Sequence, residues 1–153
     1  MISVEGFKDL DIVHQSSETL VFTAIRSYDN TKVTLKCLRP EAATVQQIAL
    51  YKQEYDLLRS LDSPFVIKAM DLIEQNNCPI LVQEQFNSPS LYKTLKIKRL
   101  TIEDALVLCR EISLALDFLH SNNVIHKHLT PENILYDLDQ NKIKLIDFEI
   151  AGH

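Results

Sequence analysis

The first half of the chain alternates apolar and polar residues with a period of two, which is typical of β-strands that bury one face. β-branched side chains are frequent in these runs, and turn-forming residues separate them. The pattern predicts five strands, at residues 11–14, 19–26, 31–38, 65–73 and 80–84. The run Ser27-Tyr28-Asp29-Asn30 predicts a hairpin turn between the second and third strands.

Between the third and fourth strands, the apolar spacing changes to that of a helix. Residues 44–61 carry apolar side chains three or four positions apart. Thr44 followed by Gln47 predicts a capping box at the start of this helix, and Ser63-Pro64 predicts its end. The first half is therefore expected to contain five strands, with one helix inserted after the third.

The second half is predicted to be mostly helical. Residues 90–95 favour a short helix, and Thr101 is the expected N-cap of a longer one. The apolar stripe of the longer helix is wider than a single face, so cover on more than one side is expected. Two short strands follow, at residues 134–136 and 143–146, around a turn at residues 137–141.

Composition and charge restrict the kind of protein. The 153 residues are expected to form one domain, and an apolar fraction of 46% suffices for a core. The net charge of −5 argues against nucleic acid and anionic membranes as main partners. The start of the chain differs from a signal peptide, and no apolar run approaches the roughly 20 residues of a membrane span. Three scattered cysteines fit a reducing compartment, so a cytoplasmic protein is expected.

Lys36 is the first residue with distinctive chemistry. Strand alternation places it on the face of Thr34, opposite Val33 and Leu35. A lysine on an inner face is costly unless it meets an anion. Glu54 on the following helix is one candidate anion, and phosphate oxygens are another. The alternative is a lysine at a strand end that reaches water.

Two motifs late in the chain carry groups that bind metal ions. They are His126-Lys127-His128-Leu129-Thr130-Pro131-Glu132-Asn133 and Asp147-Phe148-Glu149. Asn133 and Asp147 offer the oxygen ligands that Mg²⁺ prefers. The alternatives are an asparagine that satisfies its own loop and a carboxylate that caps the next turn. A further alternative is a transition-metal site made by three histidines, His120, His126 and His128.

These motifs resemble those of the protein-kinase-like superfamily. There the catalytic loop reads H-R-D-L-x-x-x-N and the metal-binding motif reads D-F-G. Lys36 is similar to the strand lysine of V-A-I-K, and Glu54 is similar to its helix partner. Residues 81–84 resemble the last strand and hinge, with Gln83 in the gatekeeper place. In a bacterial signalling subgroup of the Ser/Thr protein kinase type, a lysine follows the loop histidine. Lys127 stands at this position, so the chain resembles that subgroup.

The resemblance implies an α+β, protein-kinase-like fold. Residues 1–84 would form a five-stranded antiparallel N-lobe with one helix. Residues 85–153 would form the hinge, helices, catalytic loop and metal-binding motif, which are the first part of a helical C-lobe. The rest of that lobe is expected to be absent. The long helix would then expose an apolar face to a protein partner or to downstream domains.

The resemblance also implies ATP and Mg²⁺ as cofactors. The implied nucleotide-binding residues are Lys36, Val21, Thr34, Gln83, Glu84, Phe86, Leu135 and Asp147. The implied metal ligands are Asn133 and Asp147, as in the family. The implied catalytic residues are Lys36, Glu54, Asn133 and His128, which stands at the position of the aspartate base.

The chain departs from the family where phosphate is transferred. His128 replaces the proton-accepting aspartate, Glu149 replaces the D-F-G glycine, and Thr130 stands where many kinases have a lysine. Glu149 either disfavours phosphates or adds a metal ligand. The positions of the glycine-rich loop hold His14, Ser16 and Thr19. The hydroxyls of Ser16, Ser17 and Thr19 either bind phosphate instead or belong to an ordinary hairpin.

The expected function is therefore a protein kinase-like ATP-binding domain that is weak or inactive in phosphoryl transfer, as in a pseudokinase-like signalling module. One alternative is an active Ser/Thr protein kinase fragment that uses His128 as its base. Another is a non-catalytic protein-interaction module. The sequence leaves open whether the chain is an enzyme.

Overall fold

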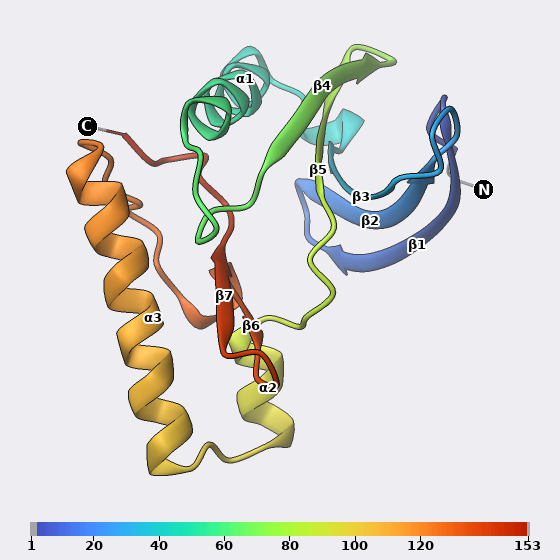
Figure 1. The fold of residues 1–153 in the computed structure, drawn as a ribbon. Coiled ribbons are helices and arrows are strands. Elements are labelled where there is room, and N and C mark those ends of the chain that lie inside the picture. Colours follow the sequence, from blue (N-terminus) through green and yellow to red (C-terminus); the bar gives the residue numbers. More distant parts are fainter. Residues whose placement is uncertain (1–2, 153) are drawn as a thin grey trace. The chain divides into compact units, whose positions relative to one another are not determined.

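A computed structural model describes residues 3–152 of the chain (Figure 1). The chain divides into two compact units. The first unit contains the chain up to Ser60 together with Lys68–Gln85, and the second contains Leu61–Ile67 and the chain from Phe86 onward.

The first unit is built on an antiparallel sheet with strand order β1-β2-β3-β5-β4. The strands are β1 (Phe7–Gln15), β2 (Thr19–Arg26), β3 (Lys32–Leu38), β4 (Ala69–Gln75) and β5 (Cys78–Glu84). The α+β class and the five-stranded antiparallel sheet are confirmed. Alternation explains the sheet, because Val33 and Leu35 are fully buried while Lys32 is exposed. β5, which lies between two neighbours, is buried along nearly its whole length.

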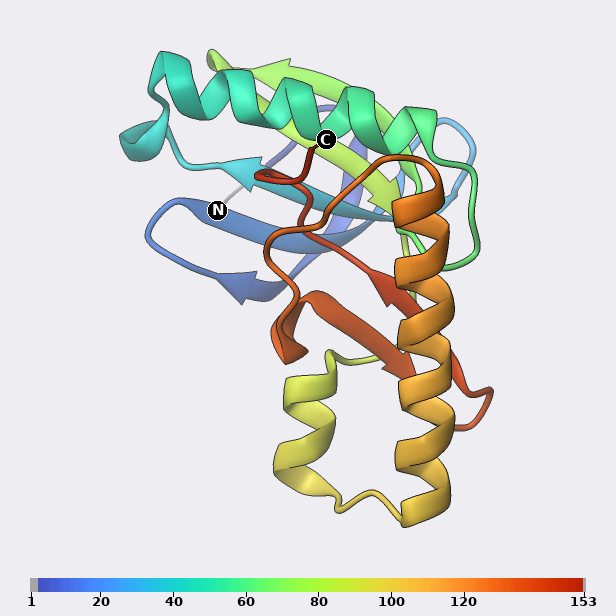
Figure 2. The same cartoon turned by 90° about the vertical axis from the view of Figure 1, so that its left-hand side faces the viewer.

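Helix α1 (Val45–Ser60) packs against β4 and β5, as Figure 2 shows for the teal helix. A short 3₁₀ turn, η1 (Pro40–Ala42), precedes it. The predicted capping box is only half present. Thr44 Oγ1 accepts from the Gln47 N–H at 3.2 Å, but the Gln47 side chain donates to Glu18 at 3.3 Å. Gln47 therefore ties the helix to the β1–β2 hairpin.

The second unit contains two helices and a small hairpin. Its elements are α2 (Leu91–Ile97), α3 (Ile102–Ser121), η2 (Pro131–Asn133), β6 (Ile134–Asp137) and β7 (Lys142–Leu145). Helix α3 begins where predicted, because Thr101 and Asp104 form a reciprocal capping box. Figures 1 and 2 both show α3 running beside the β6–β7 hairpin, and α3 contacts β7.

The predicted strand at residues 65–73 is wrong at its start. β4 begins only at Ala69, because the preceding residues pair elsewhere. Phe65 O accepts from Leu145 N at 2.8 Å, and Ile67 N donates to Leu145 O at 3.0 Å. One apolar run thus contributes to β7 in the second unit and to β4 in the first, which periodicity alone does not separate.

The long helix carries exposed apolar side chains, as expected. Ile102 and Leu106 are 78% and 66% exposed, whereas Leu108, Ala115 and Leu119 are buried. Ile97 at the end of α2 is also exposed. None of the helices in residues 3–152 combines the length and apolar character that a membrane crossing requires.

Candidate functional site

The predicted ion pair between β3 and α1 is present in the first unit. Lys36 Nζ lies 2.8 Å from Glu54 Oε2. The Glu54 side chain is fully buried and the Lys36 side chain is 12% exposed. A buried carboxylate needs a cation or hydrogen-bond donors, so this lysine is a structural partner of Glu54 as well as a candidate ligand for phosphate. The reading of Lys36 as a side chain reaching water is wrong.

Four of the predicted nucleotide-binding residues share one face of the sheet. Val21 pairs directly with Lys36, and Thr34 pairs with Gln83. Lys36 and Thr34 are two residues apart on β3, so their side chains point to the same side. Val33 and Leu35 point to the opposite side, into the core. Glu84 ends β5, where its backbone N–H donates to Lys68 O at 2.9 Å.

The β1–β2 hairpin has a different hydrogen-bond arrangement from an open phosphate cradle. Ser16 Oγ accepts from the backbone N–H of Glu18 at 3.2 Å and of Thr19 at 3.0 Å. Thr19 Oγ1 lies 3.2 Å from the hydroxyl of Tyr51 on α1. Two backbone donors that could face an anion are thus directed to the hairpin's own serine.

Tyr51 is a site-adjacent residue that sequence reasoning assigned only to an apolar stripe. Its side chain is fully buried, and its ring centroid lies 5.4 Å from Lys36 Nζ. The signal available in the sequence was its spacing, because Tyr51 precedes Glu54 by one helical turn and so shares its face. The ring therefore borders the Lys36–Glu54 pair.

The second unit brings the groups of the two late motifs together. His128 Nδ1 lies 3.0 Å from Asp147 Oδ2. Asn133 Nδ2 donates to His128 O at 3.0 Å and lies 3.4 Å from Asp147 Oδ2. Lys127 and Asp147 both have positive φ, +62° and +65°, which is uncommon for such residues. The backbone is therefore strained on both sides of the contact between His128 and Asp147.

His126 is an internal support for this loop. Its Nε2 lies 2.9 Å from Ile146 O, and its Nδ1 accepts from the His128 N–H at 3.3 Å. Its ring packs on Phe148, with centroids 4.5 Å apart. Burial lowers the pKa of His126 below its ordinary value, which favours the neutral ring. Because both ring nitrogens are engaged, the alternative metal site of three histidines is not formed.

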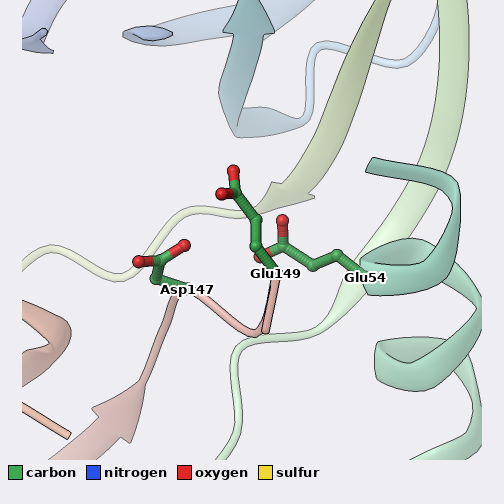
Figure 3. A group of neighbouring side chains, drawn as sticks. All are labelled: Glu54, Asp147 and Glu149. Carbon is green, nitrogen blue, oxygen red and sulfur yellow. The ribbon is translucent and has the colours of Figure 1, made fainter. Parts of the chain in front are cut away.

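Asp147 and Glu149 follow β7 on one segment of the second unit. Figure 3 shows Asp147 at the end of the strand and Glu149 farther along, while Glu54 belongs to α1 of the first unit. Carboxylate oxygens of Asp147 and Glu149 lie within 4.8 Å of each other. Asn133 donates its amide nitrogen to His128 O and to Asp147 Oδ2, so its carbonyl oxygen is the side-chain atom able to ligate a cation. Residues Asn133 and Asp147 therefore fit a divalent cation.

Two further predicted residues lie in the second unit. Phe86 follows β5 and is partly exposed. Leu135 lies on β6, pairs with Lys144 and is partly buried. Each unit thus holds a part of the predicted set. The first holds Lys36, Glu54 and the sheet face, and the second holds His128, Asn133 and Asp147.

Comparison with known proteins assigns the family. Residues 10–153 match the family described as "Protein kinase domain". The chain is 30% identical to the serine/threonine-protein kinase TIO of Arabidopsis thaliana over 98% of its length, which is 11% of that protein. It is also 30% identical to the serine/threonine-protein kinase AtPK2/AtPK19 of the same plant (99% of this chain, 32% of that protein). It is 31% identical to the serine/threonine-protein kinase SBK1 of Mus musculus (77% of this chain, 28% of that protein).

The chain thus spans a third or less of the length of each of these relatives. The match nevertheless covers nearly the whole chain, including the strand lysine, the catalytic loop and the metal-binding motif. The chain belongs to the protein kinase domain family.

Proposed function

We propose that this chain binds ATP together with Mg²⁺ and is weak or inactive in phosphoryl transfer, as a pseudokinase-like signalling module. The observation that carries the proposal is the 3.0 Å contact between His128 and Asp147. His128, at the position of the base, contacts Asp147, which is a candidate metal ligand. The other groups proposed to bind nucleotide and metal are retained.

The proposal assigns roles to residues in both units. Lys36, held by Glu54, would bind phosphate, and Asn133 and Asp147 would hold Mg²⁺. The remaining contacts to the nucleotide are assigned to Val21, Thr34, Gln83, Glu84, Phe86 and Leu135. When bound, Mg²⁺ neutralises charge on the phosphates. Residues 1–84 and 85–153 are proposed as the N-lobe and the first part of the C-lobe.

Two features support weak transfer. An aspartate base or orienting group contributes typically about 10²–10⁴-fold to a proton transfer, and His128 replaces it. The Ser16 hydroxyl also takes two backbone donors of the hairpin that stands in place of the glycine-rich loop. The groups proposed to bind nucleotide and metal are thus retained, whereas the groups needed for phosphoryl transfer are altered.

The binding proposal is tested by thermal unfolding with ATP, with and without Mg²⁺. A ligand that binds only the folded chain raises its midpoint in proportion to RT ln(1 + [L]/Kd). We expect a rise with ATP at millimolar concentration that is larger when Mg²⁺ is present. An unchanged midpoint at millimolar ATP in both conditions would rule the proposal out.

A second candidate is an active Ser/Thr protein kinase fragment with His128 as base. The half-exposed imidazole favours it, because a base must reach a substrate hydroxyl. Transfer from labelled ATP that His128→Ala abolishes would support this candidate. The control is His120→Ala, an exposed histidine on α3.

A third candidate is a protein-interaction module. The exposed Ile97, Ile102 and Leu106 on α2 and α3 favour a protein partner or further domains that cover this face. Replacing these three residues with serine is expected to abolish such an association without changing ATP binding.

Cytoplasmic localisation and membership of a bacterial signalling subgroup remain proposals from sequence, and the relatives named above are eukaryotic.

A further inference from the structure

The second unit carries a mixed nitrogen and oxygen donor cluster that the family pattern does not contain. His128 supplies an imidazole nitrogen 3.0 Å from the carboxylate of Asp147. The amide nitrogen of Asn133 donates to the same carboxylate oxygen at 3.4 Å and so helps to hold Asp147 in place. Glu149 brings a second carboxylate within 4.8 Å of Asp147. Two loops thus offer one imidazole nitrogen and two carboxylates, from His128, Asp147 and Glu149.

The spacing of the closest pair matches that of two neighbouring metal ligands. Zinc-type cations bind imidazole nitrogen and carboxylate oxygen at about 2.0–2.2 Å. Two such ligands lie about 3.4 Å apart at the tetrahedral angle, and about 3.0 Å apart at the right angle of an octahedral site. His128 Nδ1 and Asp147 Oδ2 have this separation already. A cation between them would take the place of the hydrogen bond at Nδ1, and the neutral imidazole would then carry its single proton on Nε2.

The loop backbone holds the imidazole in this place. The His128 N–H donates to His126 Nδ1, and His126 is buried against Phe148. The carbonyl oxygen of His128 accepts from Asn133 Nδ2 at 3.0 Å. Both backbone polar groups of His128 are therefore fixed by other members of the loop. The side chain is half exposed and Asp147 is a quarter exposed, so a cation and its water ligands have access.

We propose that His128 is a metal ligand, and that with Asp147 and Glu149 it makes this site prefer a first-row transition cation over Mg²⁺. Imidazole suits borderline cations such as Co²⁺ and Zn²⁺, whereas Mg²⁺ is hard and selects oxygen. The replacement of aspartate by histidine thus converts a site of oxygen ligands into a mixed one. The inference rests on the proposed function, because it shares Asn133 and Asp147 with the proposed Mg²⁺ site.

The test is a calorimetric titration of the whole chain with Co²⁺ and, separately, with Mg²⁺, at fixed pH and without nucleotide. We expect Co²⁺ to bind at least roughly tenfold more tightly than Mg²⁺, with His128→Asp removing most of this preference. His120→Ala is the matched control for adventitious binding to a surface histidine, and it should leave both affinities unchanged. Glu149→Gln should weaken Co²⁺ binding.

A spectroscopic signature separates ligation from a structural role of His128. Mn²⁺ bound to the chain should show ¹⁴N modulation in its electron spin echo, and His128→Asp should remove it. Retention of the modulation in His128→Asp, or Co²⁺ affinity that this variant leaves unchanged, would overturn the inference. If the metal preference is absent while ATP with Mg²⁺ still raises the unfolding midpoint, the inference fails and the proposed function stands. If neither ligand binds, both fail.

Discussion

Lys36 and Glu54 form a buried ion pair to which both a structural role and the proposed binding of phosphate are assigned. Glu54 is fully buried, and the Lys36 cation lies 2.8 Å away. Burying a carboxylate costs several kcal/mol unless a cation and hydrogen bonds compensate for the lost water. The lysine that is proposed to bind phosphate is therefore also part of the packing between β3 and α1.

Replacing Lys36 with methionine is expected to destabilise the fold by about 3–5 kcal/mol, because it removes the cation from a buried carboxylate. The double variant Lys36→Met/Glu54→Gln should recover more than half of this loss, since the isolated charge is gone. Urea unfolding measures both values, with the exposed Lys52→Met as control. A loss below about 1 kcal/mol in the single variant, the range of exposed ion pairs, would contradict the account.

Cys37 on β3 provides a prediction about pH. Burial raises the pKa of its thiol from 9.0 to about 12, so the folded chain keeps the proton that the unfolded chain releases near pH 9. Its contribution to stability is therefore complete below pH 9 and is lost as the pH rises toward 12. Cys37→Ala should flatten the fall of unfolding free energy above pH 9, whereas the exposed Cys109→Ser should not. Equal slopes in the two variants would refute this.

At the scale of elements, a hydrogen bond joins the β1–β2 hairpin to α1. Thr19 Oγ1 and Tyr51 Oη are 3.2 Å apart, and the Tyr51 ring borders the Lys36 ammonium at 5.4 Å. The side chain of Gln47 adds a second connection, to Glu18. The helix that carries Glu54 is thus linked to the hairpin that stands in the place of the glycine-rich loop.

Tyr51→Phe is expected to cost about 1 kcal/mol of stability, because it removes this hydrogen bond and keeps the ring. Thr19→Val should cost a similar amount or more, since it leaves the tyrosine hydroxyl without this partner. In a double-mutant cycle the two changes should show a coupling of about 0.5–1 kcal/mol. Thr23→Val on the same strand is the control. Strict additivity would show that the link contributes nothing.

Sequence periodicity predicted the elements better than their contacts. β2 and the start of α3 were predicted closely, because alternation and the Thr101 cap are local signals. The start of β4 was wrong, since residues 65–67 pair with Leu145, far along the chain. The short 3₁₀ turns at Pro40 and Pro131 carry no periodic signal.

Part of the candidate site could likewise be predicted from the sequence, and the rest depends on contacts between distant residues. Residue type and order were enough to predict Lys36, Glu54, Asn133 and Asp147, and the structure brings Lys36 to Glu54 and Asn133 to Asp147. The engagement of His128 with Asp147 required loop geometry, since residues 19 positions apart meet through two turns with positive φ. The use of Ser16 to cap its own hairpin has a local signal, a serine followed by a tight turn, which periodicity does not weigh.

At the scale of the whole molecule, membership of the protein kinase domain family accounts for the motif residues that each unit carries. The first unit holds the lysine and its carboxylate partner, and the second holds the asparagine and aspartate that fit a divalent cation. The altered residues are His128, Glu149 and the hairpin serine and threonine. The central claim is that binding of nucleotide and metal is retained while transfer is impaired.

The most direct test is a calorimetric titration of the chain with ATP in excess Mg²⁺. The account predicts a Kd of about 1 mM or tighter, a roughly tenfold loss in Asp147→Asn, and no change in the exposed turn variant Asp139→Asn. Labelled ATP incubated with the same samples should give little or no transfer. Absence of binding heat at millimolar ATP in the wild-type chain, or equal affinity in Asp147→Asn and wild type, would contradict the central claim.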